Sequence, residues 1–299
     1  MAMDDLLLVA LAGFAASLVD GALGLGFGPT SSSILLGTGM SPASVSTTVN
    51  LAKVATGIAA AISHWRFRNI DHKLVLKLAI PGAAGALIGV TILSNVDGDV
   101  IKPALAVLLI IIGLRILWRF SRPVTVQPEE FEDLAGDPDK MPPFNDKGVE
   151  VVATAGGITN GMIGAWGPVV TPFLMGRQLA PRFAVGSVNT AEVAVAAVSV
   201  TSLIAAVGKG GLDLGIIVAM LVGGMLAAPV AAWSIRHIPP RPMGVAVGGL
   251  LLLTNARELS NSVDLGVERW LAFGLVAALV ALAALRPRLQ PSVAPTPAA

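Results

Sequence analysis

Four polar residues that could bind or move a charged solute lie within long apolar stretches of the chain. Asn50 and Lys53 are three residues apart in one stretch, and Asn189 and Glu192 have the same spacing in another. A spacing of three places both members of a pair on one face of a helix. Ionisable side chains are costly inside a membrane and usually have a function there. We predict that Lys53 attracts an anion and that Glu192 carries a proton, because burial favours the neutral form of a carboxyl group.

A structural role for the same charges remains open at this stage. Lys53 and Glu192 could pair with each other as an ion pair, with no direct contact to a solute. Asp20 precedes a glycine-rich stretch, where it could either cap a helix or accept a proton.

Two further apolar segments, 5–37 and 149–176, are interrupted by glycine and proline. Each has a Gly-Pro pair, which begins at Gly28 in the first segment and at Gly167 in the second. Proline suits the first turn of a new helix, and the free N–H groups of such a turn bind anions. We predict that the two breaks hold a small anion between them, with close helix packing by small residues as the alternative. The predicted binding residues are Gly26, Phe27, Gly28, Thr30, Ser31, Asn50, Lys53, Trp166, Gly167, Thr171 and Asn189, and the predicted proton carriers are Glu192 and Asp20.

The composition excludes several classes of protein. Of the 299 residues, 54% are hydrophobic and only 13% are charged, and the mean hydropathy is +0.78. A soluble domain carries roughly 25% charged residues. The net charge of +1 gives no reason to expect a nucleic-acid partner, and the absence of cysteine excludes thiolate chemistry. Since no catalytic triad, phosphate-binding loop or metal-ligand spacing is present, we predict an all-α polytopic membrane protein that is not an enzyme and needs no cofactor or metal.

The apolar segments divide the chain into predicted elements. Full spans of about 20 residues are predicted at 42–63, 73–94, 101–120, 182–206, 213–235, 240–257 and 268–285. Neither half of 5–37 or of 149–176 is expected to be long enough to cross, so both are predicted to be re-entrant hairpins that line a cavity. The acidic, proline-rich segment 122–148 is predicted to be a cytoplasmic linker.

The segments on either side of this linker look like two copies of one unit. Asp20-Gly21-Ala22-Leu23-Gly24 matches Asn160-Gly161-Met162-Ile163-Gly164, and Asn50 matches Asn189. We therefore predict a first repeat at 1–121, a second at 149–257, and an extra span with a cytoplasmic tail at 258–299. Each repeat would cross the membrane three times, so the second copy must be inverted.

The distribution of charge orients this arrangement. With the loop 64–77 in the cytoplasm, 15 of the 20 lysines and arginines fall on the cytoplasmic side, as the positive-inside rule requires. The N-terminus is then outside and the C-terminus is in the cytoplasm. Inverted repeats with broken helices are typical of secondary transporters.

The motifs themselves resemble a known family. The stretch Val19-Asp20-Gly21-Ala22-Leu23-Gly24-Leu25-Gly26-Phe27-Gly28-Pro29, followed by Ser46-Thr47-Thr48-Val49-Asn50 and later by Gly186-Ser187-Val188-Asn189, is similar to the TauE/SafE family of sulfite and organosulfonate exporters. The resemblance implies a permease of the bacterial inner membrane for small sulfur-containing anions such as sulfite or sulfoacetate. It further implies coupling to a gradient of H⁺ or Na⁺, and a homodimer is one assembly compatible with it.

Three classes of function are therefore compared. The leading hypothesis is an ion-coupled, alternating-access transporter of a small anion, namely sulfite or an organosulfonate or other sulfur oxyanion, and a transporter of a small carboxylate is an alternative. A passive anion channel of similar build is the second, and a membrane enzyme or assembly factor is the third. Dependence of the flux on a proton gradient separates the first two, and the third would require a catalytic cluster that the sequence lacks.

Overall fold

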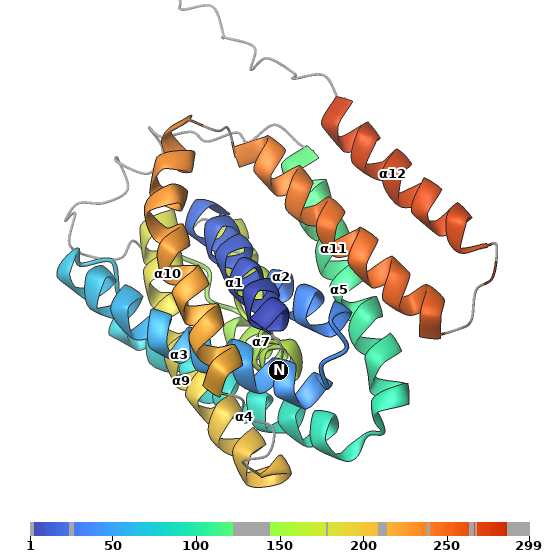
Figure 1. The fold of residues 1–299 in the computed structure, drawn as a ribbon. Helices are drawn as coiled ribbons and strands as arrows, with labels where there is room; N and C mark the ends of the chain where they lie inside the picture. The colour runs from blue at the N-terminus through green and yellow to red at the C-terminus, as the bar shows by residue number, and fades with distance from the viewer. Residues whose placement is uncertain are drawn as a thin grey trace, which may run out of the picture.

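The chain folds into a bundle of α-helices. The computed structural model describes residues 3–23, 27–121, 144–177, 179–208, 214–237, 240–262, 266 and 268–285, and all regular structure within these ranges is helical. The first half contains α1 (Met3–Leu23), α2 (Phe27–Gly37), α3 (Pro42–Arg66), α4 (His72–Asn95) and α5 (Gly98–Ser121). The second half contains α7 (Val149–Ile163), α8 (Gly167–Gly176), α9 (Pro181–Val207), α10 (Leu214–His237) and α11 (Pro240–Ser262), and α12 (Arg269–Leu285) follows (Figure 1).

Short polar residues determine where α3 and α4 begin. Ser41 precedes α3, and its Oγ accepts a hydrogen bond of 3.2 Å from the backbone N–H of Ser44. Asp71 has the same role at α4, where its Oδ1 accepts a bond of 2.8 Å from the N–H of Leu74. These side chains satisfy N–H groups that the first turn of a helix leaves without a partner.

Four helices in the described part of the chain are long and apolar enough to cross a bilayer. They are Pro42–Arg66, His72–Asn95, Val100–Ser121 and Arg182–Ala206, and each coincides with a predicted span. Helices α10, α11 and α12 lie where three more spans are predicted. The predictions of helical structure and of a membrane protein are confirmed, whereas the crossings by these last three helices stay a prediction.

The first broken segment consists of a long helix and a short one, and its re-entrant course stays a prediction. Helix α1 has 21 residues, about 32 Å at ~1.5 Å per residue, and its apolar stretch Leu6–Asp20 is shorter than the about 20 residues that a span needs. Gly13 and Gly21 stay within the helix, because an internal glycine lowers helix stability without ending the helix. The pieces α2, α7 and α8 are shorter, with 11, 15 and 10 residues.

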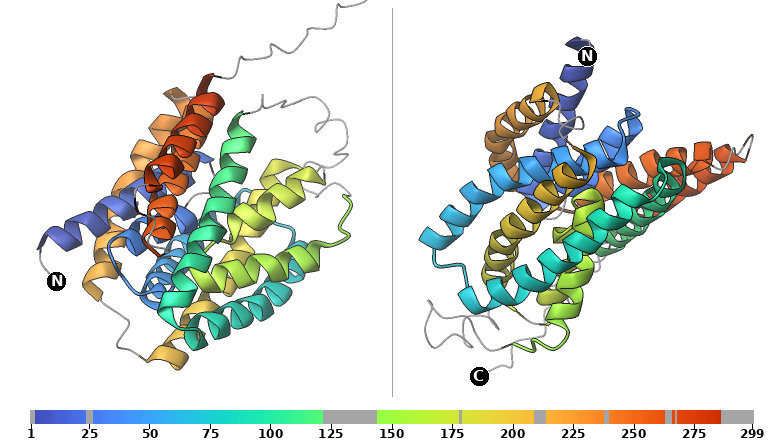
Figure 2. Two further views of the ribbon diagram at one scale, coloured as in Figure 1. Left: turned by 90° about the vertical axis from the view of Figure 1, so that its right-hand side faces the viewer. Right: turned by 90° about the horizontal axis from the view of Figure 1, so that it is seen from below.

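Most of the extensive helix pairs join one half of the chain to the other. Helix α1 packs along α10, and α7 packs along α4, while α3 packs against α9 and α5 against α11 (Figures 1 and 2). The contact between α4 and α7 depends on Gly157, since a Cβ there would lie 2.0 Å from the carbonyl oxygen of Gly82. The two halves therefore interlock along several seams and do not form separate domains.

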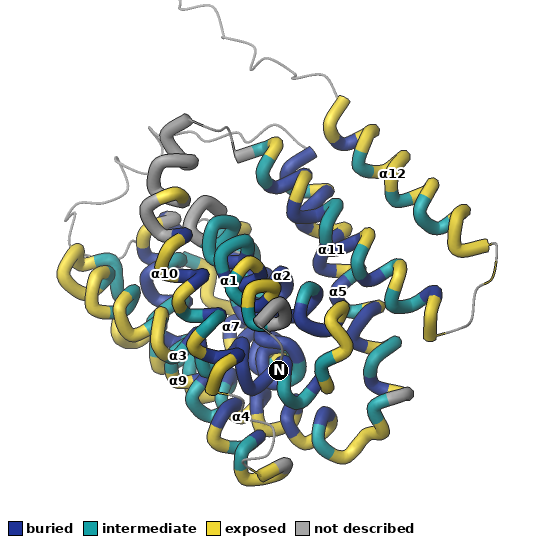
Figure 3. Tube along the Cα trace, in the orientation of Figure 1, coloured by how far each residue is buried: buried dark blue, intermediate teal, exposed yellow. Residues whose placement is uncertain are grey.

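Burial is greatest at the centre of this bundle. In α2 the buried residues include four consecutive hydroxyl-bearing side chains, from Thr30 to Ser33. Figure 3 shows the centre of the bundle as largely buried and α12 at the edge as largely exposed, and Ala283 is the buried residue of α12. A short polar helix at the centre of an apolar bundle needs internal hydrogen-bond partners, and these identify the site described next.

Candidate functional site

The start of α2 crosses the end of α7 in direct contact at the centre of the bundle. Ser32 of α2 donates a hydrogen bond from Oγ to the carbonyl oxygen of Ile163, at the end of α7, with a distance of 2.6 Å. A Cβ on Gly28 would lie 1.8 Å from the carbonyl oxygen of Gly164. Gly164 ends α7 in the left-handed conformation, with φ of 69°, which glycine adopts without strain. Glycine is therefore required on both sides of the crossing.

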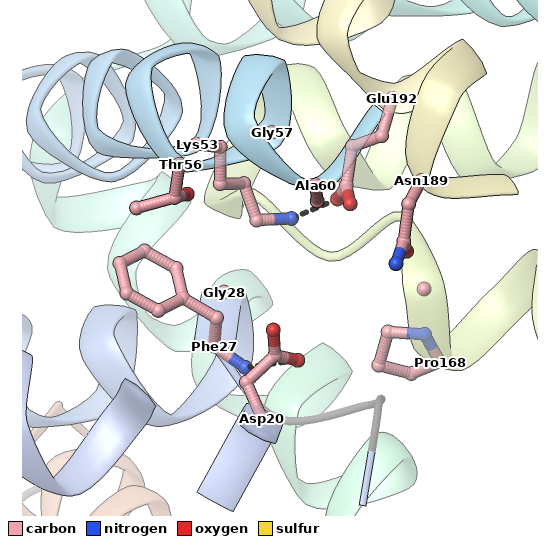
Figure 4. A pocket seen from close by; sticks show the side chains of 11 residues that line it. Asp20, Phe27, Gly28, Lys53, Thr56, Gly57, Ala60, Pro168, Asn189 and Glu192 are labelled. Carbon is pink, nitrogen blue, oxygen red and sulfur yellow. Dashed lines mark hydrogen bonds and ion pairs between the residues drawn. The ribbon is translucent and has the colours of Figure 1, made fainter. Parts of the chain in front are cut away.

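A cavity of about 110 Å³ lies beside this crossing. It is bounded by the starts of α2 and α8 and by side chains from α1, α3 and α9 (Figure 4). The lining residues are Asp20, Phe27, Gly28, Lys53, Thr56, Gly57, Ala60, Gly167, Pro168, Asn189 and Glu192. The N-terminal ends of two helices, which carry a partial positive charge, therefore border one small space.

Lys53 is the cation of this cavity. Its side chain is nearly buried, with 7% of the residue exposed, and it forms an ion pair with Oε1 of Glu192. The same Nζ donates a hydrogen bond of 2.6 Å to the carbonyl oxygen of Gly164. Lys53 thus connects α3, α9 and the break after α7, and the ion pair that the sequence left open is present.

Asp20 is a residue of α1 whose side chain reaches the start of α2. Its Oδ1 accepts a hydrogen bond of 3.3 Å from the backbone N–H of Phe27, the contact of a residue that caps a helix. Figure 4 shows the carboxylate of Asp20 directed into the cavity, on the side opposite Lys53 and Glu192. A carboxylate at this position is stabilised by the positive end of the helix, and it also brings negative charge into the cavity.

A buried hydrogen-bond network lies next to the cavity, around Asn50 and Asn160. Nδ2 of Asn160 donates to Oδ1 of Asn50 at 2.7 Å and to Oγ of Ser199 at 3.1 Å. Nδ2 of Asn50 donates in turn to the carbonyl oxygen of Asn160 at 3.1 Å. Nearby, Ser46 donates from Oγ to the carbonyl oxygen of Gly161 at 2.8 Å. This network joins α3, α7 and α9, and Asn50 is fully buried within it and does not line the cavity.

The structure brings together more than half of the predicted site residues. The cavity is lined by the predicted residues Asp20, Phe27, Gly28, Lys53, Gly167, Asn189 and Glu192. Gly26 lies outside the described residues. The remaining predicted residues are described, and none of them lines the cavity. Asn50 belongs to the buried network, Ser31 donates from Oγ to the carbonyl oxygen of Phe27 at 2.6 Å, and Trp166 donates from Nε1 to that of Val188 at 3.2 Å.

Thr30 and Thr171 are also buried away from the cavity, with 0% and 3% of their surface exposed. Among the described residues, the Oγ1 of Thr30 has no hydrogen-bond partner. The roles predicted for both residues stay predictions.

One wall of the cavity was not predicted from the sequence. Thr56, Gly57 and Ala60 follow Lys53 at intervals of three, four and seven residues, which is one face of a helix. Small side chains on the face that carries a buried lysine are a usable signal of open space. Asn160 was likewise not predicted as the partner of Asn50, because no local pattern links residues 110 positions apart. Among the described residues, no group of three His, Cys, Asp or Glu side chains could hold a metal ion.

Comparison with known proteins identifies the family. The family model described as Sulfite exporter TauE/SafE matches residues 9–257. The chain is 38% identical over 263 residues to "Probable membrane transporter protein YtnM" of Bacillus subtilis (strain 168), a match that covers 87% of this chain and 84% of that protein. No solved structure matches. The chain therefore belongs to the TauE/SafE family, as the resemblance predicted, and it is a multi-pass membrane protein.

The contact between α2 and the end of α7 predicts that alanine substitutions at two glycines of α2 differ in their effect on stability. Gly28→Ala should lower the stability by about 1–3 kcal/mol, because the new methyl group meets a backbone oxygen that cannot move away easily. Gly37→Ala is the matched control, since a Cβ there has no neighbour within 4 Å. The thermal unfolding midpoint of the two purified variants measures the difference. Equal midpoints would show that the breaks do not cross as described.

The Lys53–Glu192 pair predicts non-additive effects of neutral substitutions. Lys53→Gln or Glu192→Gln alone should destabilise the fold by about 3 kcal/mol or more, because each leaves an unpaired charge in a mostly buried site. The double variant should recover much of this loss, since it removes both charges and keeps the shapes. Thermal unfolding of the wild type and the three variants gives the coupling energy.

Lys77→Gln serves as the control for loss of a lysine, since Lys77 pairs with Asp146 and Glu150 where all three side chains are solvent-accessible, and such pairs contribute little. A double variant as unstable as the less stable single variant would contradict the pairing.

Proposed function

We propose that this member of the TauE/SafE family is a secondary transporter that binds a small anion, such as sulfite or an organosulfonate, in the cavity beside the helix breaks. The proposal rests on one observation, the convergence of Lys53 and the N-terminal ends of α2 and α8 on a single cavity. The family description and the name of the Bacillus subtilis relative support transport over enzymatic activity.

The size of the cavity favours a small ion. Pockets for drug-sized ligands have volumes of roughly 300–1,000 Å³, whereas this cavity has about 110 Å³. A compact oxyanion or a short organosulfonate matches this volume. The amide of Asn189 and the hydroxyl of Thr56 add polar groups to the wall, which suits an acceptor-rich head group.

The charges around the cavity support coupling to protons. Lys53 on α3 faces two carboxylates, Asp20 on α1 and Glu192 on α9, and the described lining residues of α2 and α8 carry no charge. With both carboxylates ionised, the wall has a formal charge of −1, which repels an anion in a poorly hydrated space. We therefore propose that the anion replaces Glu192 at Lys53 and that Glu192 takes up a proton in the same step.

The helix pairing supports two inverted repeats. If α1 to α5 correspond to α7 to α11, exchanging the repeats turns the α1–α10 pair into the α7–α4 pair. The same exchange maps the α3–α9 and α5–α11 pairs onto themselves. A pseudo-twofold axis between the repeats would produce this set of contacts, and transporters of this kind bind substrate near such an axis.

Corresponding positions in the two repeats differ in exposure. The repeat alignment pairs Lys53 with Glu192 and the face formed by Thr56, Gly57 and Ala60 with that formed by Val195, Ala196 and Ser199. The first face lines the cavity. The second is fully buried, with 0% exposure at all three residues. One side of the proposed axis is thus open, and the equivalent side is closed.

The polar residues at the breaks show the same asymmetry. In the repeat alignment, Asn160 corresponds to Asp20 and Asn50 to Asn189. Asn160 and Asn50 are hydrogen-bonded in the closed network, whereas Asp20 and Asn189 both face the open cavity. We propose that transport exchanges these two arrangements, so that Asp20 and Asn189 close together while Asn160 and Asn50 separate. The open side follows the C-terminal half of α3, which the charge distribution places toward the cytoplasm.

Alternating access predicts a reciprocal pattern of labelling. The natural chain has no cysteine, so Thr56→Cys and Val195→Cys each introduce a single thiol. In membranes, a membrane-impermeant thiol reagent should label Thr56→Cys from the cytoplasmic side. It should label Val195→Cys from the outer side, at a rate that changes when the anion is present. Labelling of both thiols from the same side would contradict the proposed exchange.

Proton coupling predicts a pH change when the anion binds. Adding methanesulfonate, which does not titrate near neutral pH, to purified protein in weak buffer should raise the pH through proton uptake. Glu192→Gln should abolish this uptake, and Lys53→Gln should weaken anion binding, measured as loss of thermal stabilisation by the ligand. Proteoliposome flux that is independent of a proton gradient would instead support a passive channel.

A further inference from the structure

The C-terminal end of α5 carries two arginines beside apolar grooves, and only Pro168 is shared between the lining of these grooves and that of the proposed transport cavity. Arg115 and Arg119 are four residues apart, so their charges lie on one face of the helix and repel each other. Within the described residues neither arginine has a carboxylate partner, and Arg119 donates from Nη2 to the weak acceptor Sδ of Met175 at 3.6 Å. The site is therefore arranged to receive an anionic group.

One apolar groove runs from this end of α5 along α12. Its first part has a volume of about 480 Å³ and begins at Arg115, Trp118 and Ser121. It continues, through the shared residues Leu114 and Leu279, into a second part of about 230 Å³ with an entirely apolar lining surface. Helix α12 lies at the edge of the bundle (Figure 1) and packs mainly on α11, with fewer contacts to α5.

A second groove lies on another side of the same arginines, between α5 and α8. It has a volume of about 370 Å³, shares Arg115 and Trp118 with the first groove, and includes Arg119. Its remaining lining is mainly apolar, with Ile112 and Met175 among the contacts. Two apolar grooves thus diverge from one cationic position.

We propose that this position binds an anionic phospholipid, with the phosphate at Arg115 and Arg119 and one acyl chain in each groove. The first groove extends along α5 from Ser121 to Ile110, about 16 Å at ~1.5 Å per residue, which is close to half of a ~30 Å hydrocarbon core. One leaflet has this depth. Trp118 lies at the head of the grooves, where tryptophan marks the level of the lipid head groups.

A diacyl anionic lipid fits these features better than a segment of the chain. The linker that follows Ser121 is acidic and could pair with the arginines, but it is poor in aliphatic residues. An extended backbone in the grooves would also leave peptide groups without partners next to lipid. The positive-inside rule places this end of α5 at the cytoplasmic surface, where anionic lipids attract basic residues.

Lipid titration of the purified full-length chain tests the proposal. Phosphatidylglycerol added to mixed micelles should raise the thermal midpoint more than phosphatidylcholine at the same mole fraction. Arg115→Gln with Arg119→Gln should require a roughly 30-fold higher phosphatidylglycerol fraction for half of the effect, given about 1 kcal/mol for each arginine. Arg257→Gln is the matched charge control, because it removes an exposed arginine near the C-terminal end of α11 that lines neither groove. This variant should leave the titration unchanged.

A second pair of variants tests the grooves independently of the charges. Leu279→Trp should fill the first groove and weaken the phosphatidylglycerol effect, whereas Leu271→Trp, on an exposed position of the same helix outside the groove, should not. Native mass spectrometry of the same samples should show phosphatidylglycerol retained by the wild type and by the two control variants, Arg257→Gln and Leu271→Trp. Equal midpoints in the two lipids would overturn the proposal. So would reproduction of the effect by inorganic phosphate alone, or an effect that Leu279→Trp leaves intact.

Discussion

A helix that stops inside a bilayer must find partners for the backbone groups that it frees, because lipid offers none. Here the start of α2 meets the end of α7 at the buried centre of the bundle, and the surrounding side chains supply the partners. Lys53 binds the carbonyl oxygen of Gly164, Ser32 binds that of Ile163, and Asp20 receives the first N–H of α2. The polar residues of the centre are therefore consequences of the crossing, and they leave a polar cavity in an otherwise apolar bundle.

The same constraint gives Lys53 two partners that an anion would have to replace or share. Its ammonium group completes the end of α7 and also neutralises Glu192. A buried ion pair contributes little net stability when its desolvation is included, so it is well suited to be exchanged for another partner. Under the proposed function, anion binding offsets the loss of the contact between Lys53 and Glu192. The hydrogen bond from Lys53 to the carbonyl oxygen of Gly164 keeps the lysine in place.

Similar sequence in the two halves does not give identical environments. Lys53 and Glu192 hold corresponding positions, yet the helix face beyond Lys53 is open and the face beyond Glu192 is buried. Packing of α7 along α4 and the bonds between Asn50 and Asn160 close the second face. At its edge the bundle has a different character, since α12 covers α11 and leaves the arginine end of α5 beside apolar grooves. Polar side chains therefore line the central cavity, and two arginines lie at the C-terminal end of α5.

The sequence by itself determined the helical membrane architecture, the two breaks, and Lys53 and Glu192 as charges within spans, because hydropathy, glycine-proline pairs and residue spacing are local properties. It also located most of the cavity residues on their helices. Only the tertiary structure decided that Lys53 and Glu192 pair, that Asn50 bonds to Asn160 and not toward the cavity, and that Trp166 is buried. Those outcomes depend on contacts between residues far apart in the chain, for which no local pattern carries a signal.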